Sequence, residues 1–514
     1  MTPEAATDPL DRLDATLKAR TGLRLRVACP SQEFSAEEMS FGPGRWLSSS
    51  RGLWESLRVA SHANSALVML QAPPVGRAVE DYLLGVVPPD VTSEADRRAR
   101  HALVEIDDDG ERHLSEKVLA DTRLVERLRC TVELAGRAGH SVDGLACFAS
   151  SRRMADLADA LGLKLLEADP QLLGWGDKSG SRQLFRAAGV RHLPGSYVAD
   201  HDVPSLAARL AALVRDHGPG HWIVKLDRGF GSGHGNAFVD IRTDSATGIE
   251  RELLTSLCPA STAVDRPQFL QWLHRVGAIV ERRVRCAPGT TLGAPSALGH
   301  LSVASAAGAR TELLGIHDQL VGAAGDYLGC RYPARSEYRA EAAQEADKAF
   351  SALAARGVVG HVGVDFIAVP PADGSDGSAL YATEINLRQT GSTHPNRTVR
   401  AVLPLARNAA GELIARDGHD VYFRATDSVL TPSCRGLPAA HLISALRRSA
   451  RLSLDPDAGR GVVPHLWPAL ARFGKIGVTA IGRSAAECDQ LMAEFTELLV
   501  RLGESGPRSR TAFI

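Results

Sequence analysis

Apolar residues over positions 1–175 alternate between short continuous runs and a helical spacing. The short runs are typical of buried strands and lie at 23–29, 66–70, 102–106 and 144–148. At 152–163 the apolar positions lie on one face of a predicted helix. Strands that alternate with helices indicate a mostly parallel, Rossmann-like sheet. No G-x-G-x-x-G sequence opens a helix there, so this region carries no dinucleotide-binding signature.

The pattern changes near Gly174. We expect helices at 177–188, with Asp177 as the cap, and at 205–216. Strands are expected at 221–227, 236–241, 278–285, 313–316, 363–369 and 380–385. Towards the end, amphipathic helices at 437–451 and 486–502 flank a strand at 475–481. The predicted division is an α/β region at 1–175, a core at 176–405 with a lid subdomain at about 220–282, and a small α/β module at 406–514.

The composition, 44% hydrophobic and 23% charged, is that of an ordinary globular protein, and 514 residues suffice for about two to four domains. A formal net charge of −1 gives no overall field that would attract nucleic acid or an anionic membrane. The eight cysteines form no C-x-x-C pair, which argues against a zinc site or a disulfide framework. The sequence has no apolar leader and no run of about 18 apolar residues, so we expect a cytoplasmic protein.

A glycine-rich loop at 229–235 joins two predicted strands, the first of which contains Lys225. Glycines let several backbone N–H groups point at one anion, which suits a polyphosphate. A Walker loop would lie between a strand and a helix and would end in a lysine, and that sequence is absent. The loop is either a phosphate-covering hairpin or a flexible hairpin tip. Because lysine occurs only seven times in the chain, Lys225 favours the first interpretation.

A second lysine, Lys178, stands at the start of a predicted helix. A cation is unfavourable in the first turn of a helix, where the dipole prefers an anion. Either a bound phosphate or full solvent exposure would explain this position.

Asp365 lies on one predicted strand, and Glu384 and Asn386 lie on the next. Alternate residues of a strand face the same side, so Glu384, Asn386 and Arg388 project together, and Asp365 joins them if the two strands pair. Two carboxylates and an amide oxygen are a ligand set that Mg²⁺ takes beside substrate phosphates. Arg388 would neutralise charge on a transferring group. The alternative is an exposed, charged strand edge. His394, in the loop that follows, has no recognisable partner carboxylate or serine, so a nucleophilic triad is not indicated.

Taken in order, these segments resemble the ATP-grasp superfamily over residues 174–399. The resemblance implies an α+β ATP-grasp core behind a Rossmann-like pre-ATP-grasp domain, with ATP and Mg²⁺ bound. It implies that Lys178 and Lys225 contact the ATP phosphates, that Glu281 lies at the adenine hinge, and that the backbone at Arg282 and Val284 bonds the base.

The other implied roles concern the loop and the metal. The residues expected to close over the phosphates are Gly229, Gly231, Ser232, Gly233 and His234. Asp365, Glu384 and Asn386 would hold Mg²⁺, and Arg388, with Lys225, would be catalytic and face the acyl phosphate. The family often has an acidic residue just after the hinge that binds ribose. Residues 287–289 offer none, so the ribose contact is unassigned.

A narrower resemblance is to the pheganomycin-type peptide ligases, carried by residues 313–319, 329–333, 384–396 and 474–482. Such enzymes form an amide between a carboxylic acid, often a non-proteinogenic amino acid, and the amine of a peptide in natural-product biosynthesis. The implied partners are a small carboxylic acid and an amine or peptide acceptor, with no nucleic acid and no membrane. The oligomeric state stays open, a homodimer included. Two alternatives also stay open: a bicarbonate-dependent, carboxylase-like enzyme and a non-catalytic, ATP-binding regulatory protein.

Overall fold

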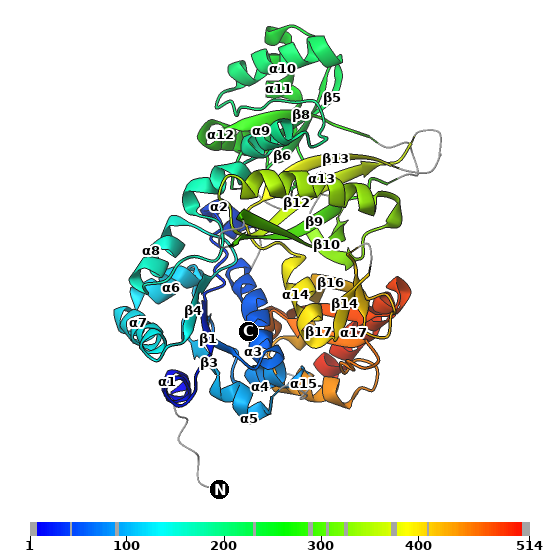
Figure 1. The fold of residues 1–514 in the computed structure, drawn as a ribbon. Coiled ribbons are helices and arrows are strands. Elements are labelled where there is room, and N and C mark those ends of the chain that lie inside the picture. Colours follow the sequence, from blue (N-terminus) through cyan, green and yellow to red (C-terminus); the bar gives the residue numbers. More distant parts are fainter. Residues whose placement is uncertain are drawn as a thin grey trace, which may run out of the picture. The chain divides into compact units, whose positions relative to one another are not determined.

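A computed structural model describes residues 8–41, 44–87, 92–229, 233–285, 291–304, 308–322, 327–371, 378–408 and 411–505 (Figure 1). The chain divides into two compact units. Unit 1 comprises Met1–Glu33, Gly44–Glu167 and Gly391–Ile514, and unit 2 comprises Phe34–Pro43 and Ala168–Thr390. Unit 1 is therefore built from segments at the two ends of the sequence.

The N-terminal part of unit 1 is a four-stranded parallel sheet in the order β3-β2-β1-β4. Its strands are β1 (Arg24–Ala28), β2 (Ser65–Gln71), β3 (His101–Glu105) and β4 (Ser141–Ala146). β2 is buried along its whole length, as its continuous apolar run requires. The accompanying helices are α1 (Pro9–Ala19), η1 (Arg45–Glu55), α3 (Ser56–Ser61), α4 (Arg77–Gly85), α5 (Glu94–Ala99), α6 (Leu114–Ala120), α7 (Thr122–Arg137) and α8 (Arg152–Ala160). The predicted Rossmann-like arrangement is confirmed.

The C-terminal part of unit 1 is a three-stranded antiparallel arrangement, β16-β18-β17. Its elements are α14 (Thr393–Val402), β14 (Leu405–Arg407), β15 (Leu413–Ala415), β16 (Tyr422–Leu430), η3 (Pro432–Cys434), α15 (Ala439–Arg448), β17 (Gly461–His465), α16 (Trp467–Phe473), β18 (Lys475–Gly482) and α17 (Ala485–Ser505). This part contacts the N-terminal sheet's helices, since α15 lies beside α4 and the Tyr82 hydroxyl donates to the Val462 carbonyl at 3.5 Å. The three-domain division with boundaries at 175 and 405 stays a prediction.

Unit 2 contains a small sheet in the order β7-β6-β5-β8, within residues 220–282, whose role as a lid stays a prediction. Its strands are β5 (Gly220–Leu226), β6 (Asn236–Ile241), β7 (Cys258–Pro259) and β8 (Ala278–Arg282), and they pair antiparallel. Helices α10 (Val203–His217), α11 (Ala246–Ser256) and α12 (Arg266–Val276) contribute to the same core. Trp222 and Phe269 are fully buried in it.

A second, antiparallel set of strands in unit 2 runs in the order β13-β12-β9-β10-β11. Its strands are β9 (Pro295–Ala304), β10 (Gly308–Val321), β11 (Tyr327–Tyr332), β12 (Gly360–Val369) and β13 (Ala379–Asn386). The long helix α13 (Ser336–Ala354) packs against β9 and β10, and α9 (Lys178–Ala188) packs against β13. The remaining elements of unit 2 are α2 (Ala36–Ser40) and η2 (Pro170–Gly176). Among the described helices, none is both long enough and apolar enough to cross a membrane.

Candidate active site

The start of helix α9 is held by Asp227, at the end of β5, and not by the predicted cap Asp177. The Asp227 carboxylate accepts from the Ser179 N–H at 2.7 Å and the Ser179 hydroxyl at 3.2 Å, and its carbonyl accepts from the Lys178 N–H at 2.9 Å. Asp177 occupies the cap position but its side chain accepts no hydrogen bond from the helix. Asp177 is therefore the N-cap residue, as predicted, but the carboxylate of Asp227, which is distant in sequence, takes the free N–H group instead of its side chain.

Asp177 instead forms an ion pair with Arg228, at 3.1 Å. Burial, together with the charge of Asp227, raises the pKa of Asp177 to about 6 despite Arg228. The first turn of α9 is thus a place where carboxylates and cations crowd together.

Lys178 forms an ion pair with Glu384 of β13. The two elements are also joined by the Ile385 N–H, which donates to the Ser181 hydroxyl at 3.0 Å. Burial disfavours the charged amine, but Glu384 outweighs it and raises the pKa of Lys178. The Lys178 side chain is only 16% exposed, so solvent exposure does not account for its place in the first turn.

Strands β12 and β13 pair antiparallel, as predicted, with Asp365 directly opposite Glu384. The Asn386 amide nitrogen donates to Asp365 Oδ2 at 2.9 Å, so a metal beside it would meet the amide oxygen. Burial and the nearby Glu384 raise the pKa of Asp365. Burial also opposes ionisation of Glu384, but Lys178, Lys225 and Arg388 together lower its pKa.

These oxygens fit a magnesium ion. The donors at this place, two carboxylates and an amide oxygen, are all hard oxygen ligands. Burial and, after it, repulsion by Glu384 raise the pKa of Asp365, and a divalent cation beside the two carboxylates would relieve both effects.

Lys225, Glu281 and Arg182 form a buried ion cluster. Lys225 Nζ donates to Glu281 Oε1 at 2.9 Å, and Arg182 Nη1 donates to Glu281 Oε2 at 2.7 Å. Arg182 also donates to the carbonyls of Ser196 and Leu193, each at 2.7 Å. Two cations share one carboxylate, so the cluster keeps a positive charge that an anion can use.

Arg182 was not singled out from the sequence, although a signal existed. It lies one helical turn after Lys178 and therefore faces the same side of α9.

The predicted adenine hinge lies where β8 ends. The Arg282 N–H donates to the Pro194 carbonyl at 2.8 Å, so any bond from this residue's backbone to a base would use its carbonyl oxygen. The Arg282 guanidinium donates to the Gly218 carbonyl at 3.0 Å and lies over the Trp222 ring. Val284 lies beyond the strand, which is shorter than the expected 278–285.

The glycine-rich loop joins β5 and β6 as a hairpin, with Lys225 opposite Asn236. Gly231 and Ser232 lie outside the described residues. Gly233 has a φ of +78°, a conformation that glycine adopts without strain, and its carbonyl accepts from the Asn236 N–H at 3.1 Å. His234 donates to or accepts from the Ser261 hydroxyl at 3.0 Å.

A segment far away in sequence flanks this loop. The ring of Phe41 stacks on His234, with centroids 3.9 Å apart and planes 4° from parallel. The Ser35 hydroxyl donates to the Gly229 carbonyl at 3.0 Å, and Arg275 pairs with Glu37. Nothing in the sequence placed residues 34–41 beside the glycine-rich loop.

The structure therefore brings Lys178, Lys225 and Arg388 close enough to Glu384 to lower its pKa. Three cations around an oxygen-only ligand set can bind a polyphosphate together with a divalent metal.

Comparison with known proteins agrees with this geometry. Residues 172–287 match the family described as IQCH-like, ATP-grasp, and residues 299–392 match the ATP-grasp domain family. The chain is 30% identical, over 82% of its length and 83% of the relative's, to the L-propargylglycine--L-glutamate ligase of Streptantibioticus cattleyicolor.

Solved structures share the fold. A biotin carboxylase in a β,γ-ATP complex from Campylobacter jejuni matches with a TM-score of 0.52 at 12% identity, covering 94% of this chain and 95% of that one. The biotin carboxylase domain of a thermophilic 2-oxoglutarate carboxylase bound to bicarbonate matches with a TM-score of 0.50 at 12% identity, covering 94% of each chain. The chain belongs to the ATP-grasp superfamily, as a carbon–nitrogen ligase of the pheganomycin type that uses ATP.

Proposed function

We propose that this ligase joins the carboxylate of one amino acid, often a non-proteinogenic one, to the amine of a second amino acid or peptide. The acid would first attack the γ-phosphate of ATP, which gives an acyl phosphate and ADP. The amine would then attack the acyl carbon and release phosphate. The observation that supports this proposal most is the cluster of Lys178, Lys225 and Arg388 about Glu384, in a chain whose relative is named for two amino acids.

Each charged side chain has a role in this proposal. Lys178 and Lys225 neutralise the phosphates and hold them in line for attack. Arg388 stabilises the charge that develops on the acyl phosphate and then on the carbonyl oxygen. Asp365, Glu384 and Asn386 hold Mg²⁺, which when bound draws negative charge from the phosphate oxygens. The hairpin between β5 and β6, flanked by Phe41, excludes water from the acyl phosphate.

The context of the reaction follows from the same chemistry. An amide between a non-standard amino acid and a peptide is a natural-product linkage, so we place the enzyme in such a biosynthesis. The described cysteines are all free thiols, which is compatible with work in the reducing cytoplasm.

The two alternatives separate cleanly in one assay. A bicarbonate-dependent carboxylase would release ADP with bicarbonate and without an amine, whereas a regulatory protein would release none. The likeness to biotin carboxylases shows the fold alone at 12% identity, so it does not favour the first alternative.

The test is ADP release from the full chain with MgATP and pairs of amino acids, with mass detection of the amide. L-propargylglycine with L-glutamate is the first pair to try, followed by panels in which the acid and the amine vary separately. We expect ADP and amide in equal amounts, and only when both acid and amine are present. ADP release with bicarbonate alone, or no amide from any pair, would overturn the proposal.

A further inference from the structure

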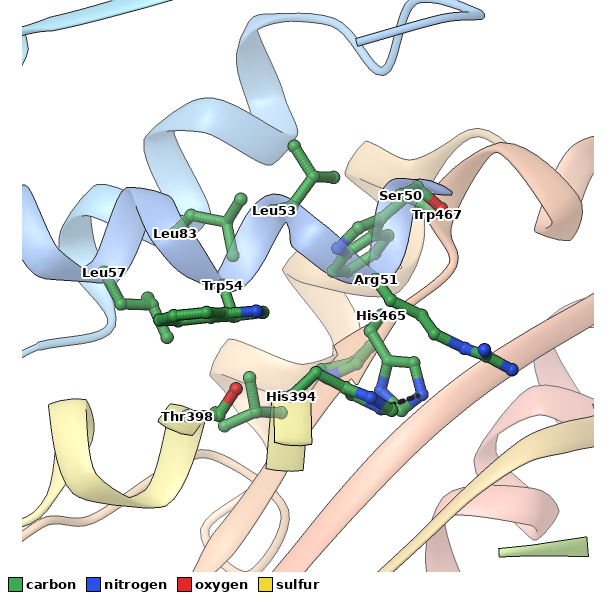
Figure 2. Close-up of a pocket in the computed structure, with 12 residues that line it drawn as sticks. Ser50, Arg51, Leu53, Trp54, Leu57, Leu83, His394, Thr398, His465 and Trp467 are labelled. Atoms are coloured by element: carbon green, nitrogen blue, oxygen red, sulfur yellow. Dashed lines mark hydrogen bonds between the residues drawn. The ribbon is translucent and has the colours of Figure 1, made fainter. Parts of the chain in front are cut away.

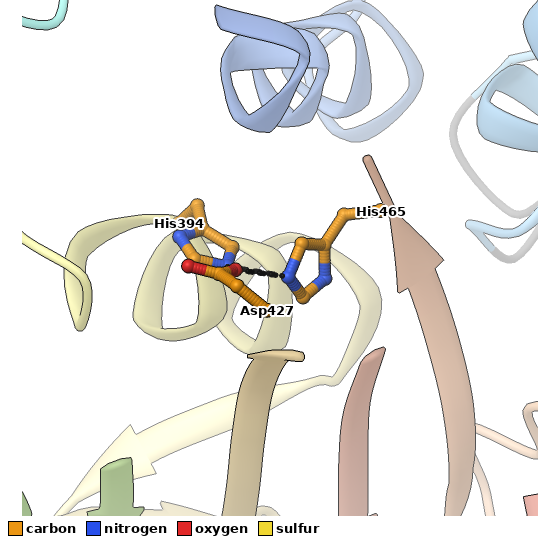
Figure 3. Close-up of side chains that lie close together, drawn as sticks. All are labelled: His394, Asp427 and His465. Atoms are coloured by element: carbon orange, nitrogen blue, oxygen red, sulfur yellow. Dashed lines mark hydrogen bonds and ion pairs between the residues drawn. The ribbon is translucent and has the colours of Figure 1, made fainter. Parts of the chain in front are cut away.

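Three side chains of the kind that bind metals converge within unit 1 (Figure 3). His394 lies in the first turn of α14, Asp427 lies in β16 and His465 ends β17. All three are buried, with 4%, 7% and 9% of their surface exposed. No partner for His394 could be identified from the sequence, because Asp427 and His465 are distant along the chain.

The distances between the facing atoms suit one small ion. His394 Nε2 lies 3.1 Å from His465 Nε2, His465 Nε2 lies 2.7 Å from Asp427 Oδ1, and His394 Nε2 lies 3.7 Å from Asp427 Oδ1. Three atoms with these separations lie on a circle of radius about 1.9 Å. A point about 2.0–2.1 Å from each, the usual zinc–nitrogen and zinc–oxygen distance, therefore exists about 0.8 Å from their plane. That is nearly the geometry of three ligands on a tetrahedral ion.

Protons alone do not satisfy this cluster. A carboxylate only accepts, so the contact between His465 Nε2 and Asp427 Oδ1 requires the proton on His465 Nε2. His394 Nε2 then faces a donor, and a proton placed there would have its nearest carboxylate at 3.7 Å. A proton on His394 Nδ1 instead lies on a buried atom with no hydrogen-bond partner. A cation lets the three facing atoms present lone pairs to one centre and removes the conflict between facing protons, although His394 Nδ1 then carries the proton and still has no hydrogen-bond partner.

The surroundings hold these side chains in place. Arg51 of η1 forms an ion pair with the other carboxylate oxygen of Asp427, so Oδ1 is left directed at the histidines. Gly477 of β18 lies opposite His465, and a Cβ there would come within 2.1 Å of His465 Nε2. The residue after His465, Leu466, has a φ of +61°, which is strained for a leucine. A glycine that admits the imidazole and a strained turn beside it fix His465 in this orientation.

A cavity of ≈ 20 Å³ adjoins the histidines, and Figure 2 shows His394, His465 and Arg51 at its wall. This volume holds about one water molecule.

We propose that His394, Asp427 and His465 bind a divalent transition-metal ion of the zinc class, with water as the fourth ligand. Two imidazoles and one carboxylate leave one position open on a tetrahedral ion. Imidazole ligands favour zinc or cobalt over magnesium and calcium, which prefer oxygen. Arg51 orients the ligating carboxylate, as outer partners of metal ligands do. The positive charge of Arg51 also repels a cation at this site, so only an ion that forms strong bonds to its ligands would stay bound.

The competing interpretation is a buried hydrogen-bonded cluster that binds no ion. Cobalt(II) distinguishes the two, because tetrahedral cobalt absorbs visible light strongly and octahedral cobalt absorbs it weakly. The full chain carrying Glu384→Gln, which disables the predicted magnesium site, is treated with a chelator and titrated with cobalt(II) chloride. We expect a strong visible band that saturates at a single ion per chain and disappears when zinc is added.

Three matched variants in the same background locate the ion. His394→Gln and His465→Gln each remove a ligand and should weaken cobalt binding by at least about 100-fold. His300→Gln changes a histidine that packs against His361 in unit 2, and it should leave the band unchanged.

Thermal unfolding gives a second readout. Zinc should raise the melting temperature of the chelator-treated chain, since it binds the folded state, but not that of the His465→Gln variant. The absence of a strong band, or an equal band in all variants, would overturn the proposal. If the glutamine variants do not fold, cobalt uptake and zinc stabilisation by the unaltered ligand set decide it, and failure of either overturns it.

Discussion

Glu384 is the side chain with which three cations of the site interact. We expect Glu384→Ala and Lys225→Ala each to lower ADP release by about 100-fold or more, because each removes a charge that orients or stabilises the transferring phosphoryl group. Glu341→Ala, a half-buried carboxylate of α13 that pairs with Arg191, is the control and should keep normal turnover. A coupled ADP assay with saturating substrates measures all three. Near-normal turnover in both site variants would contradict the assignment of these residues.

Arg182 illustrates how much a buried cation can stabilise the folded state. Arg182→Met leaves Glu281 with one cation instead of two and frees two carbonyls, so we expect about 3–5 kcal/mol loss in the free energy of unfolding. Arg186→Met, on the exposed face of the same helix, removes only a cation–π contact with the Tyr197 ring and should lower it by no more than about 1 kcal/mol. Urea unfolding of the two variants measures both losses. If Arg182 did not stabilise the fold, the two variants would lose equal amounts of unfolding free energy.

Asp177 should make stability fall as the pH rises. Its pKa of about 6 lies above the unfolded value of about 3.9, so the folded state binds the proton more tightly. That contribution is present below about pH 4 and is lost as the pH rises through 6. Asp177→Asn should therefore stabilise the protein above pH 6, by roughly 1 kcal/mol after screening, and have no such effect near pH 4.

For a second aspartate, Asp202, the contribution to stability should depend on pH in the opposite direction. The Asp202 carboxylate accepts the Ser205 N–H at the start of α10, and these hydrogen bonds lower its pKa. Its contribution is present at neutral pH and lost in acid, so Asp202→Asn should not stabilise the protein at pH 7. Unfolding curves of both variants at several pH values test the pair, and parallel curves would contradict the assignment for Asp177.

Single residues differ in how far the sequence could reveal them. Asp365 and Glu384 were predictable, because strand periodicity and the order of two neighbouring strands place them opposite each other. Asp227 as the partner of Ser179, and Phe41 as the neighbour of His234, were not. Those contacts join residues that are far apart in the sequence, and no local sequence pattern indicates such a contact.

Among the elements, the strands that were predicted agree with the structure within a few residues, except that β8 is shorter and β10 much longer. Helix α13 and strand β9 were missed. α13 is rich in alanine on its buried face, so hydrophobic periodicity is weak there, and β9 contains glycine and serine where a strand usually has bulky residues. Both elements owe their place to packing on each other more than to local preference.

That packing is close at Gly299 of β9. A Cβ there would lie 2.6 Å from the ring of Phe350, a buried residue of α13. Gly299→Ala should therefore push the helix from the strands and cost about 1–3 kcal/mol. Gly136→Ala is the control, because a Cβ there meets nothing within 4 Å and alanine favours the helix α7. Thermal unfolding should show opposite signs for the two variants, and equal shifts would contradict the packing argument.

For the whole molecule, the main difference from the predicted series of consecutive domains is that unit 1 combines segments from the two ends of the chain. The Tyr82 and Trp467 rings lie 5.5 Å apart, and the Trp46 and Phe473 rings lie 6.4 Å apart. A chain truncated to 1–405 would expose these aromatic surfaces. We expect it to lose cooperative unfolding and to bind a hydrophobic dye.

Limited proteolysis of the truncated chain shows which region has lost its structure. Cleavage should concentrate within 44–167, since these residues lose their partners, and unit 2 should resist longer. An unchanged melting temperature for 1–405 would instead support an independent C-terminal module at 406–514.

The divided sequence of unit 1 also sets an order of events during synthesis. Residues 44–167 leave the ribosome before the strands and helices of 391–505 that complete their unit exist, whereas the whole of unit 2 has been made by residue 390. Nascent chains stalled once residue 390 has left the ribosome should thus contain a folded ATP-grasp core and a Rossmann-like sheet whose unit still lacks residues 391–505. For that interval, the exposed helices α3 and α4 are the part of the molecule that most needs a chaperone.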